Sequence, residues 1–181
     1  NYYARGEKGF YLGGPAPFGY NKTETIINGQ KTCTFEENKT ESLVLSAIYN
    51  DYINGKSMSE IARNLNNDKI PSKRNKPWSE TAIARMLRNP VYVKANADIY
   101  NYLQALGGTM TNPVEEYTGI HGCYVYGTTE KRTGSKFTNL NNDFVSLGLH
   151  NGIIEPSLWL NVQMLINQKK NHSNLGTGSL S

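Results

Sequence analysis

Cysteine and histidine are scarce in this chain of 181 residues, which has two of the first and three of the second. Cys33 and Cys123 lie far apart without Cys-x-x-Cys spacing, which argues against a disulfide framework or a zinc ribbon, and each is expected to be a buried thiol. His121, His150 and His172 have no carboxylate or cysteine companions at ligand spacing. We therefore expect surface or ordinary structural roles for them, and no metal site.

The chain also lacks an apolar run of about 18 residues and a charged-then-apolar leader, so neither a membrane span nor a secretory signal is predicted. We expect a soluble, cytoplasmic protein that needs no cofactor and acts on no small-molecule substrate. Hydrophobic residues make up 38% of the sequence. That content is enough for one sizeable core or two small ones.

What the sequence does have is a local excess of positive charge. Residues 57–94 contain eight Lys or Arg and three acids, a balance of +5, whereas the whole chain carries +4. The basic character is therefore concentrated in one segment, as expected for a surface that meets a polyanion. The alternative is that Lys69, Lys73, Arg74 and Lys76 only solvate an exposed loop.

Two short amphipathic helices are predicted within this segment. The first follows an N-cap at Ser57 or Ser59 and buries residues at three-and-four spacing; the second begins at Trp78, buries a similar stripe, and ends at Asn89 because Pro90 follows. The expected buried positions are Met58, Ile61, Ala62, Leu65, Trp78, Ala82, Ile83, Met86 and Leu87. Trp78 is expected to be a core anchor rather than a stacking residue.

The outward face of the second helix carries small, hydroxylic and cationic residues, which suit the major groove of DNA. Two helices joined by a basic connector are typical of a helix-turn-helix reader. Arg85 is the expected base reader, and Arg88 is expected to read a base or hold a phosphate. The predicted DNA contacts in the two helices and their connector are Lys73, Arg74, Asn75, Lys76, Ser79, Thr81, Ala84, Arg85 and Arg88. We assign no catalytic residue.

The first 20 residues contain five glycines, two prolines and six aromatics. Such a segment is too flexible for a helix, and Arg5 and Lys8 within it are predicted to follow a DNA backbone or enter the minor groove as an extended arm. The alternative is a structured loop whose aromatics cover the core. The two interpretations are compatible, with Phe18 and Tyr20 packed and the two cations exposed.

The remaining elements predict an α+β fold, with a winged-helix-like helix-turn-helix domain followed by a small mixed region of helix and antiparallel sheet. A hairpin is expected over residues 23–35 with its turn at Asn28-Gly29. Helices are expected over residues 41–53 and 97–106, and from Pro156 onwards. Strands are expected at residues 123–126, 136–140 and 144–147. Lys131, Arg132 and Lys136 would form a positive turn that either touches DNA or is solvated.

The order of these motifs resembles the recombinase domain of the large serine recombinases, the phage integrases, transposases and resolvases of bacterial mobile elements. The matching parts lie at Gly14 to Tyr20, Gly55 to Ser57, Ile61 to Asn66, Trp78-Ser79 and Leu87 to Tyr92. The resemblance covers roughly 80 residues, and its specificity lies in the order and spacing of the parts. The later stretch resembles the transposase branch more weakly.

The resemblance implies sequence-specific binding of double-stranded DNA, such as an attachment site or transposon end, in partnership with the rest of the recombinase chain and other protomers. It also implies a resolvase-like catalytic domain and a zinc ribbon, and neither is visible in this sequence. We therefore expect a fragment without enzymatic activity. When it is bound to DNA, we expect it to be associated with the nucleoid. The expected divisions are residues 1–95 for DNA binding, 96–172 for the small α+β region and 173–181 for a linker-like tail. The alternatives are a free-standing helix-turn-helix regulator and a protein-interaction module with an acidic partner.

Overall fold

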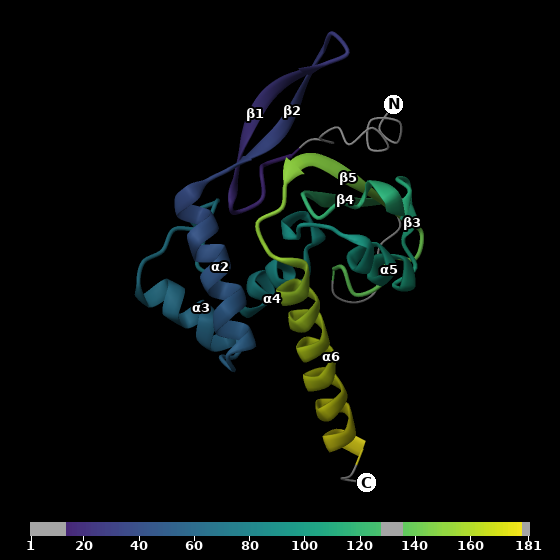
Figure 1. The fold of residues 1–181 in the computed structure, drawn as a ribbon. Coiled ribbons are helices and arrows are strands. Elements are labelled where there is room, and N and C mark those ends of the chain that lie inside the picture. Colours follow the sequence, from purple (N-terminus) through teal and green to yellow (C-terminus); the bar gives the residue numbers. More distant parts are fainter. Residues whose placement is uncertain (1–13, 128–135, 179–181) are drawn as a thin grey trace.

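The computed structural model describes residues 14–127 and 136–178 and confirms the mixed α+β class (Figure 1). Two 3-10 turns, η1 and η2, accompany the helices and strands. The elements in chain order are β1 (Tyr20–Ile27), β2 (Gln30–Glu37), α2 (Lys39–Ile53), α3 (Met58–Asn67), α4 (Glu80–Arg88), η1 (Pro90–Tyr92), α5 (Ala97–Ala105), β3 (Thr109–Met110), η2 (Val114–Glu116), β4 (His121–Gly127), β5 (Asp143–Asn151) and α6 (Pro156–Gly178).

The predicted hairpin is confirmed. Strands β1 and β2 pair in antiparallel register from Tyr20 opposite Glu37 to Ile27 opposite Gln30. The turn residues Asn28 and Gly29 have φ angles of 51° and 77°. Two consecutive positive φ angles are what a tight two-residue hairpin turn requires, which is why Asn-Gly is favoured there. The hairpin projects from the body at the end opposite the C-terminus of α6 (Figure 1).

Helices α2, α3 and α4 each begin at a polar side chain that caps the first turn. The side chains of Asn38, Ser57 and Ser79 accept hydrogen bonds from the backbone N–H groups three residues later. These caps satisfy donors that have no partner inside the helix. Of the two serines predicted as the cap of α3, Ser57 and Ser59, the cap is Ser57. The predicted end of α4 before Pro90 is confirmed.

Trp78 precedes α4 instead of beginning it, which corrects the predicted start by two residues. Its backbone N–H donates to the Asn66 side chain at 2.8 Å, its carbonyl accepts from the same amide at 2.9 Å, and these bonds hold it outside the helix. Its indole donates to the Ile70 carbonyl at 2.8 Å, and its ring meets Phe18 edge-on at a centroid distance of 5.0 Å. The predicted role as core anchor is confirmed.

The C-terminal end of α4 is held by side chains from two other helices. The Tyr49 hydroxyl of α2 donates to the Met86 carbonyl at 2.8 Å and lies 3.2 Å from the Leu87 carbonyl. The Gln163 amide of α6 donates to the Leu87 carbonyl at 2.6 Å. The last carbonyls of a helix have no partner within it, so buried donors from outside are needed to satisfy them.

Strand β5 lies between β3, which is parallel to it, and β4, which is antiparallel. The predicted strands at residues 123–126 and 144–147 are confirmed, whereas the prediction of a strand at 136–140 and of a purely antiparallel sheet is wrong. Residues 136–140 are not extended because Phe137 has a φ of 70°, in the left-handed region. That backbone conformation cannot continue a pleated strand.

One hydrophobic core runs across the expected boundary at residue 95. Tyr20 and Phe35 of the hairpin contact the ring of His150 in β5 at centroid distances of 5.3 and 5.5 Å. His150 is buried, and its Nε2 lies 2.8 Å from the carbonyl oxygen of Val91, to which it donates. The N-terminal hairpin and the sheet therefore share their packing.

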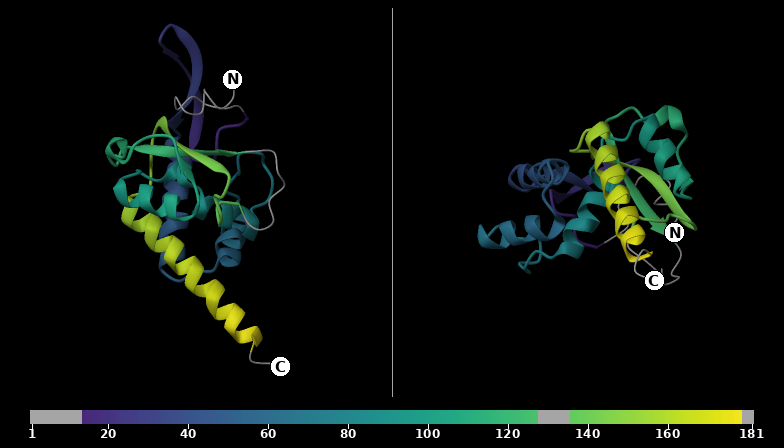
Figure 2. Two further views of the ribbon diagram at one scale, coloured as in Figure 1. Left: turned by 90° about the vertical axis from the view of Figure 1, so that its right-hand side faces the viewer. Right: turned by 90° about the horizontal axis from the view of Figure 1, so that it is seen from below.

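Helix α6 starts at Pro156, as predicted, and continues to Gly178. The stretch from residue 173, for which composition predicts a linker, is thus helical as far as Gly178, because elongating an existing helix adds a hydrogen bond for each residue that is ordered. The distal end of α6 reaches beyond the other elements (Figure 1 and the left view of Figure 2). Among the described residues, we find no helix with the length and apolar character needed to span a bilayer.

Replacing Gln163 with Met should lower the free energy of unfolding by roughly 1–3 kcal/mol, because the buried Leu87 carbonyl loses the 2.6 Å bond while the side-chain volume is kept. Urea unfolding followed by circular dichroism measures the change. Gln168→Met, on an exposed position of α6, is the matched control and should stay within about 0.5 kcal/mol of wild type. Equal effects of the two substitutions would contradict the role of Gln163.

Stability should also fall in mild acid because of His150, whose pKa is lowered to about 4, chiefly by burial. In the unfolded chain the imidazole titrates near pH 6.5, so below that value the unfolded state binds a proton that the folded state does not. The contribution of neutral His150 to the free energy of unfolding is complete above about pH 6.5. It is lost as the pH falls towards about 4, and its total is roughly 3 kcal/mol.

Urea unfolding across this pH window, compared between wild type and His150→Gln, isolates the effect. The wild type should lose the extra stability and the variant should not. His172→Gln removes an exposed histidine of α6 and should behave as wild type does. Parallel pH profiles for wild type and His150→Gln would rule out His150 as the cause.

Candidate functional site

Helix α4 divides cleanly into a buried and an outward face. Ile83, Met86 and Leu87 are buried, whereas Thr81 and Arg85 on the opposite side are exposed. Ala84 and Arg88, on the same outward side, are half-buried. The sequence prediction of which residues face outward is therefore confirmed, and among the described residues the outward face of α4 is not sealed inside the core.

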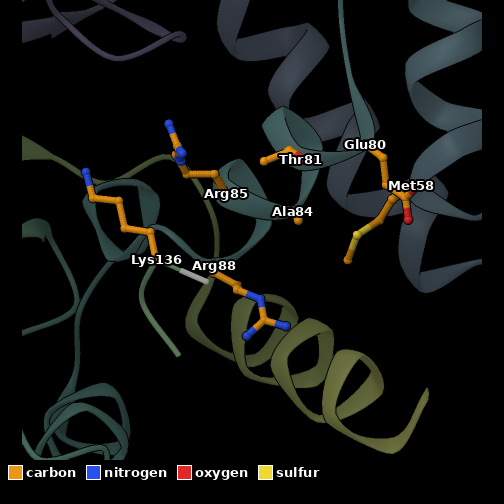
Figure 3. Close-up of a pocket in the computed structure, with 7 residues that line it drawn as sticks. All are labelled: Met58, Glu80, Thr81, Ala84, Arg85, Arg88 and Lys136. Atoms are coloured by element: carbon orange, nitrogen blue, oxygen red, sulfur yellow. The ribbon is translucent and has the colours of Figure 1, made fainter. Parts of the chain in front are cut away.

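The outward face forms the floor of an open hollow of about 510 Å³ (Figure 3). Four of the predicted site residues meet there. The hollow is lined by Met58, Glu80, Thr81, Ala84, Arg85, Arg88 and Lys136. Figure 3 shows Arg85 and Lys136 extending on the same side of the hollow, while the Arg88 guanidinium points the other way, over α6.

Positive charge dominates this lining, with three cations and one acid. The acid, Glu80, accepts a hydrogen bond from the Ser59 hydroxyl at 2.9 Å. That bond ties the start of α4 to α3 at the edge of the hollow. An anion entering the hollow would therefore meet a net positive field, which is stronger than in open solvent because the walls are protein.

Arg88 is the least hydrated of the three cations. Burial lowers the pKa of its guanidinium, and the nearby Tyr102 and Tyr52 hydroxyls counter that shift. Its Nε atom is buried and has no hydrogen-bond partner among the described residues. Guanidinium groups remain charged in proteins, so Arg88 keeps its positive charge at this half-buried position.

Ser79 and Thr81, the two hydroxyl residues predicted to contact DNA, have different surroundings. The Ser79 side chain accepts from the Ala82 N–H at 3.1 Å and so caps α4. A capping hydroxyl is oriented by that bond. Thr81 is the second residue of α4, is exposed, and lines the hollow directly.

The basic connector before α4 is a folded loop rather than a loose one. The Lys73 ammonium pairs with the Glu41 carboxylate at 2.9 Å, and that carboxylate also accepts from the Gly19 N–H at 2.9 Å. The Ser72 hydroxyl accepts from the Lys76 N–H at 3.0 Å and donates to the Lys76 carbonyl at 2.8 Å. The Lys73 ammonium is therefore already paired with a carboxylate of the protein.

Arg74, Asn75 and Lys76 are exposed, and Asn75 has a φ of 54°, which turns the loop back towards α4. None of the three lines the hollow. The predicted contact residues Arg5 and Lys8 lie outside the described residues, as do Lys131 and Arg132 of the predicted positive turn.

Three residues that line the hollow were not in the set of predicted contacts: Met58, Glu80 and Lys136. For Lys136, DNA contact was one of the two alternatives given for the positive turn. Met58 and Glu80 occupy the first turns of α3 and α4, where a local pattern could have placed them near one another. Lys136 comes from the segment before β5, and nothing in the sequence around it indicates contact with α4.

Among the described residues, no cysteine or histidine lines the hollow. Cys33 is half-buried and Cys123 buried, both as free thiols, and burial raises the pKa of Cys123 to about 12. The expectation of a buried thiol is thus met at Cys123. In the part of the chain that the structure describes, no group of three or more His, Cys, Asp or Glu is placed to hold a metal ion.

Comparison with known proteins adds a family match. A protein-family model described as Recombinase matches residues 39–169. One solved structure similar to the chain is described as the crystal structure of an LSR–DNA complex, with 15% sequence identity, a TM-score of 0.46, and coverage of 91% of this chain and 36% of that one. The chain thus spans about a third of the length of that protein. A search of curated proteins gives no match.

Proposed function

The chain belongs to the recombinase family, and from that premise we propose that it binds double-stranded DNA in a sequence-specific manner by placing α4 in the major groove. The observation that carries the proposal is the open, cationic outward face of α4. A helix fits the major groove, and arginine donates two hydrogen bonds to a guanine edge there.

We infer that α3 and α4 form the helix-turn-helix unit and that α2 supports it. The Ser59–Glu80 hydrogen bond joins the two helices, and the Asn66–Trp78 hydrogen bonds join α3 to the residue that lies two positions before α4. The connector of residues 68–79 is longer than the tight turn of simple helix-turn-helix proteins, and its folded loop supplies exposed cations. The winged-helix-like form remains a prediction, with the β1–β2 hairpin before α2 as the strand pair nearest to these helices along the chain.

Different residues take different parts in this proposal. Arg85, exposed in the second turn of α4, reads a base, with Thr81 and Ala84 beside it for contacts to a thymine methyl. Arg74, Asn75 and Lys76 contact the phosphate backbone and set the register. Arg88 contributes charge from a half-buried position. An extended N-terminal arm carrying Arg5 and Lys8 follows the DNA backbone or enters the minor groove.

For the parent protein we propose a serine site-specific recombinase of a bacterial mobile element, acting in integration, excision or transposition. The family resemblance supports this, and it favours a recombinase over a free-standing transcription regulator. In that setting this chain recognises the site in the cytoplasm, on nucleoid DNA, while strand cleavage belongs to the resolvase-like domain of the family. In this proposal the protein acts together with other recombinase protomers. Its parts are the DNA-binding region of residues 1–95, the α+β region of residues 96–172 and the tail of residues 173–181.

The test of DNA recognition is selection from a pool of randomised duplexes, followed by salt titration of the chosen and scrambled sequences. Specific binding should survive as an affinity ratio while both affinities fall linearly with salt on logarithmic axes. Failure to enrich any sequence, with equal weak binding to all duplexes, would refute the proposal. If the protein binds no duplex at all, the result favours the alternative function, binding of an acidic protein partner.

Arg85→Ala should cost roughly 1–3 kcal/mol of binding free energy on the selected duplex and flatten discrimination at one base position, because a bidentate base contact is lost. Fluorescence anisotropy on single-position variants of the duplex measures this. Arg63→Ala removes an exposed arginine of α3 that does not line the hollow, so it should leave base discrimination intact. Uniform loss across all sequences would reassign Arg85 to a phosphate.

Lys76→Ala should weaken binding to selected and scrambled duplexes alike and reduce the salt slope by about one unit, because a phosphate contact carries no sequence information. The neighbouring Lys73 is paired with Glu41, so Lys73→Ala should change the slope less and lower stability instead. Salt titrations and urea unfolding of both variants separate the two roles. A larger slope change for Lys73→Ala than for Lys76→Ala would reverse the assignment.

A further inference from the structure

Lys136 reaches the same hollow as the outward face of α4, although it lies far along the chain, just before β5. It is exposed, lines the hollow with Arg85 and Arg88, and extends on the same side as Arg85 (Figure 3). The DNA-facing surface proposed above is therefore not made by the helices alone. The segment from residue 136 contributes one of its three cations.

The residues that follow Lys136 are packed into the protein. Phe137 is buried at 9% exposure and has a φ of 70°, which is strained for an aromatic residue. Leu140 is fully buried and its N–H donates to the Leu106 carbonyl at 3.0 Å. Strained conformations persist only where the surroundings impose them, and they cluster at functional sites. The burial of Phe137 and Leu140 positions Lys136 at the wall of the hollow.

The electrostatics of the hollow favour an extended anion over a single neutral partner. Lys136, Arg85 and Arg88 share one concave surface, and like charges held together repel. Glu80 is the only acid among the described residues that line it, and it lies on the α3 side of the hollow with Ser59. A strand with phosphates at regular spacing relieves the repulsion of several cations at once.

We propose that Lys136 contacts a phosphodiester of the DNA strand that borders the groove entered by α4. The inference rests on the proposed function and extends it to residues outside the helix-turn-helix unit. Base edges lie on the groove floor, where the exposed Arg85 can reach them, whereas a residue on the wall beside the helix meets the sugar–phosphate backbone. Lys136 therefore adds affinity and fixes orientation without reading sequence.

The experiment compares wild type with Lys136→Gln, Lys136→Arg and Lys39→Gln on the selected duplex and on scrambled duplexes of about 20 base pairs. Fluorescence anisotropy is measured across a range of salt concentrations. The Lys136→Gln slope of log affinity against log salt should fall by about 0.9, the value for one lost phosphate contact on duplex DNA. Lys136→Arg keeps the charge and should keep the slope.

Lys39→Gln is the matched control, because Lys39 is an exposed lysine at the start of α2 that pairs with Glu37 at 2.8 Å, and its removal changes the net charge by the same amount. A slope for Lys136→Gln equal to that of Lys39→Gln overturns the inference while leaving DNA binding by α4 intact. Absence of binding by wild type to every duplex overturns the proposed function, and the inference with it. Loss confined to one sequence would show that Lys136 reads a base, which also contradicts the inference.

Discussion

The structure depends on how the last carbonyls of α4 are satisfied. Tyr49 of α2 and Gln163 of α6 donate to the carbonyls of Met86 and Leu87, and the Trp159 indole donates to the carbonyl of Asn89 at 3.3 Å. These groups are withdrawn from water, so a missing donor costs more than an ordinary hydrogen bond contributes. Because the donors come from both sides, α4 is held between α2 and α6 with its charged face left open.

That arrangement links the core to the proposed function. The face of α4 that packs against the core is apolar, and the opposite face is cationic and lines the hollow. A short helix of nine residues would be marginal by itself, so its orientation is supplied by the surrounding elements. The proposed reading of bases by Arg85 thus depends on Tyr49, Gln163 and Trp159, which orient α4 but are not proposed to contact DNA.

Local signals in the sequence were sufficient for most elements. Asn28-Gly29 encodes the hairpin turn, Ser57 the start of α3, and Pro90 the end of α4, each through a physical preference of a few neighbouring residues. The outward residues of α4 followed from helical periodicity. Contacts between distant segments did not follow: the Lys73–Glu41 pair and the place of Lys136 depend on tertiary packing, and Phe137 interrupts a strand that composition favours.

The length of α6 has a mechanical consequence. A helix of 23 residues is about 35 Å long, and this one is joined near its beginning to the end of α4. The part of α6 beyond Gln163 is about 22 Å long, so by simple geometry a rotation of about 5° transmitted through Gln163 displaces the far tip by about 2 Å. The angle at which α4 lies against a partner would therefore determine where the distal end of α6 points.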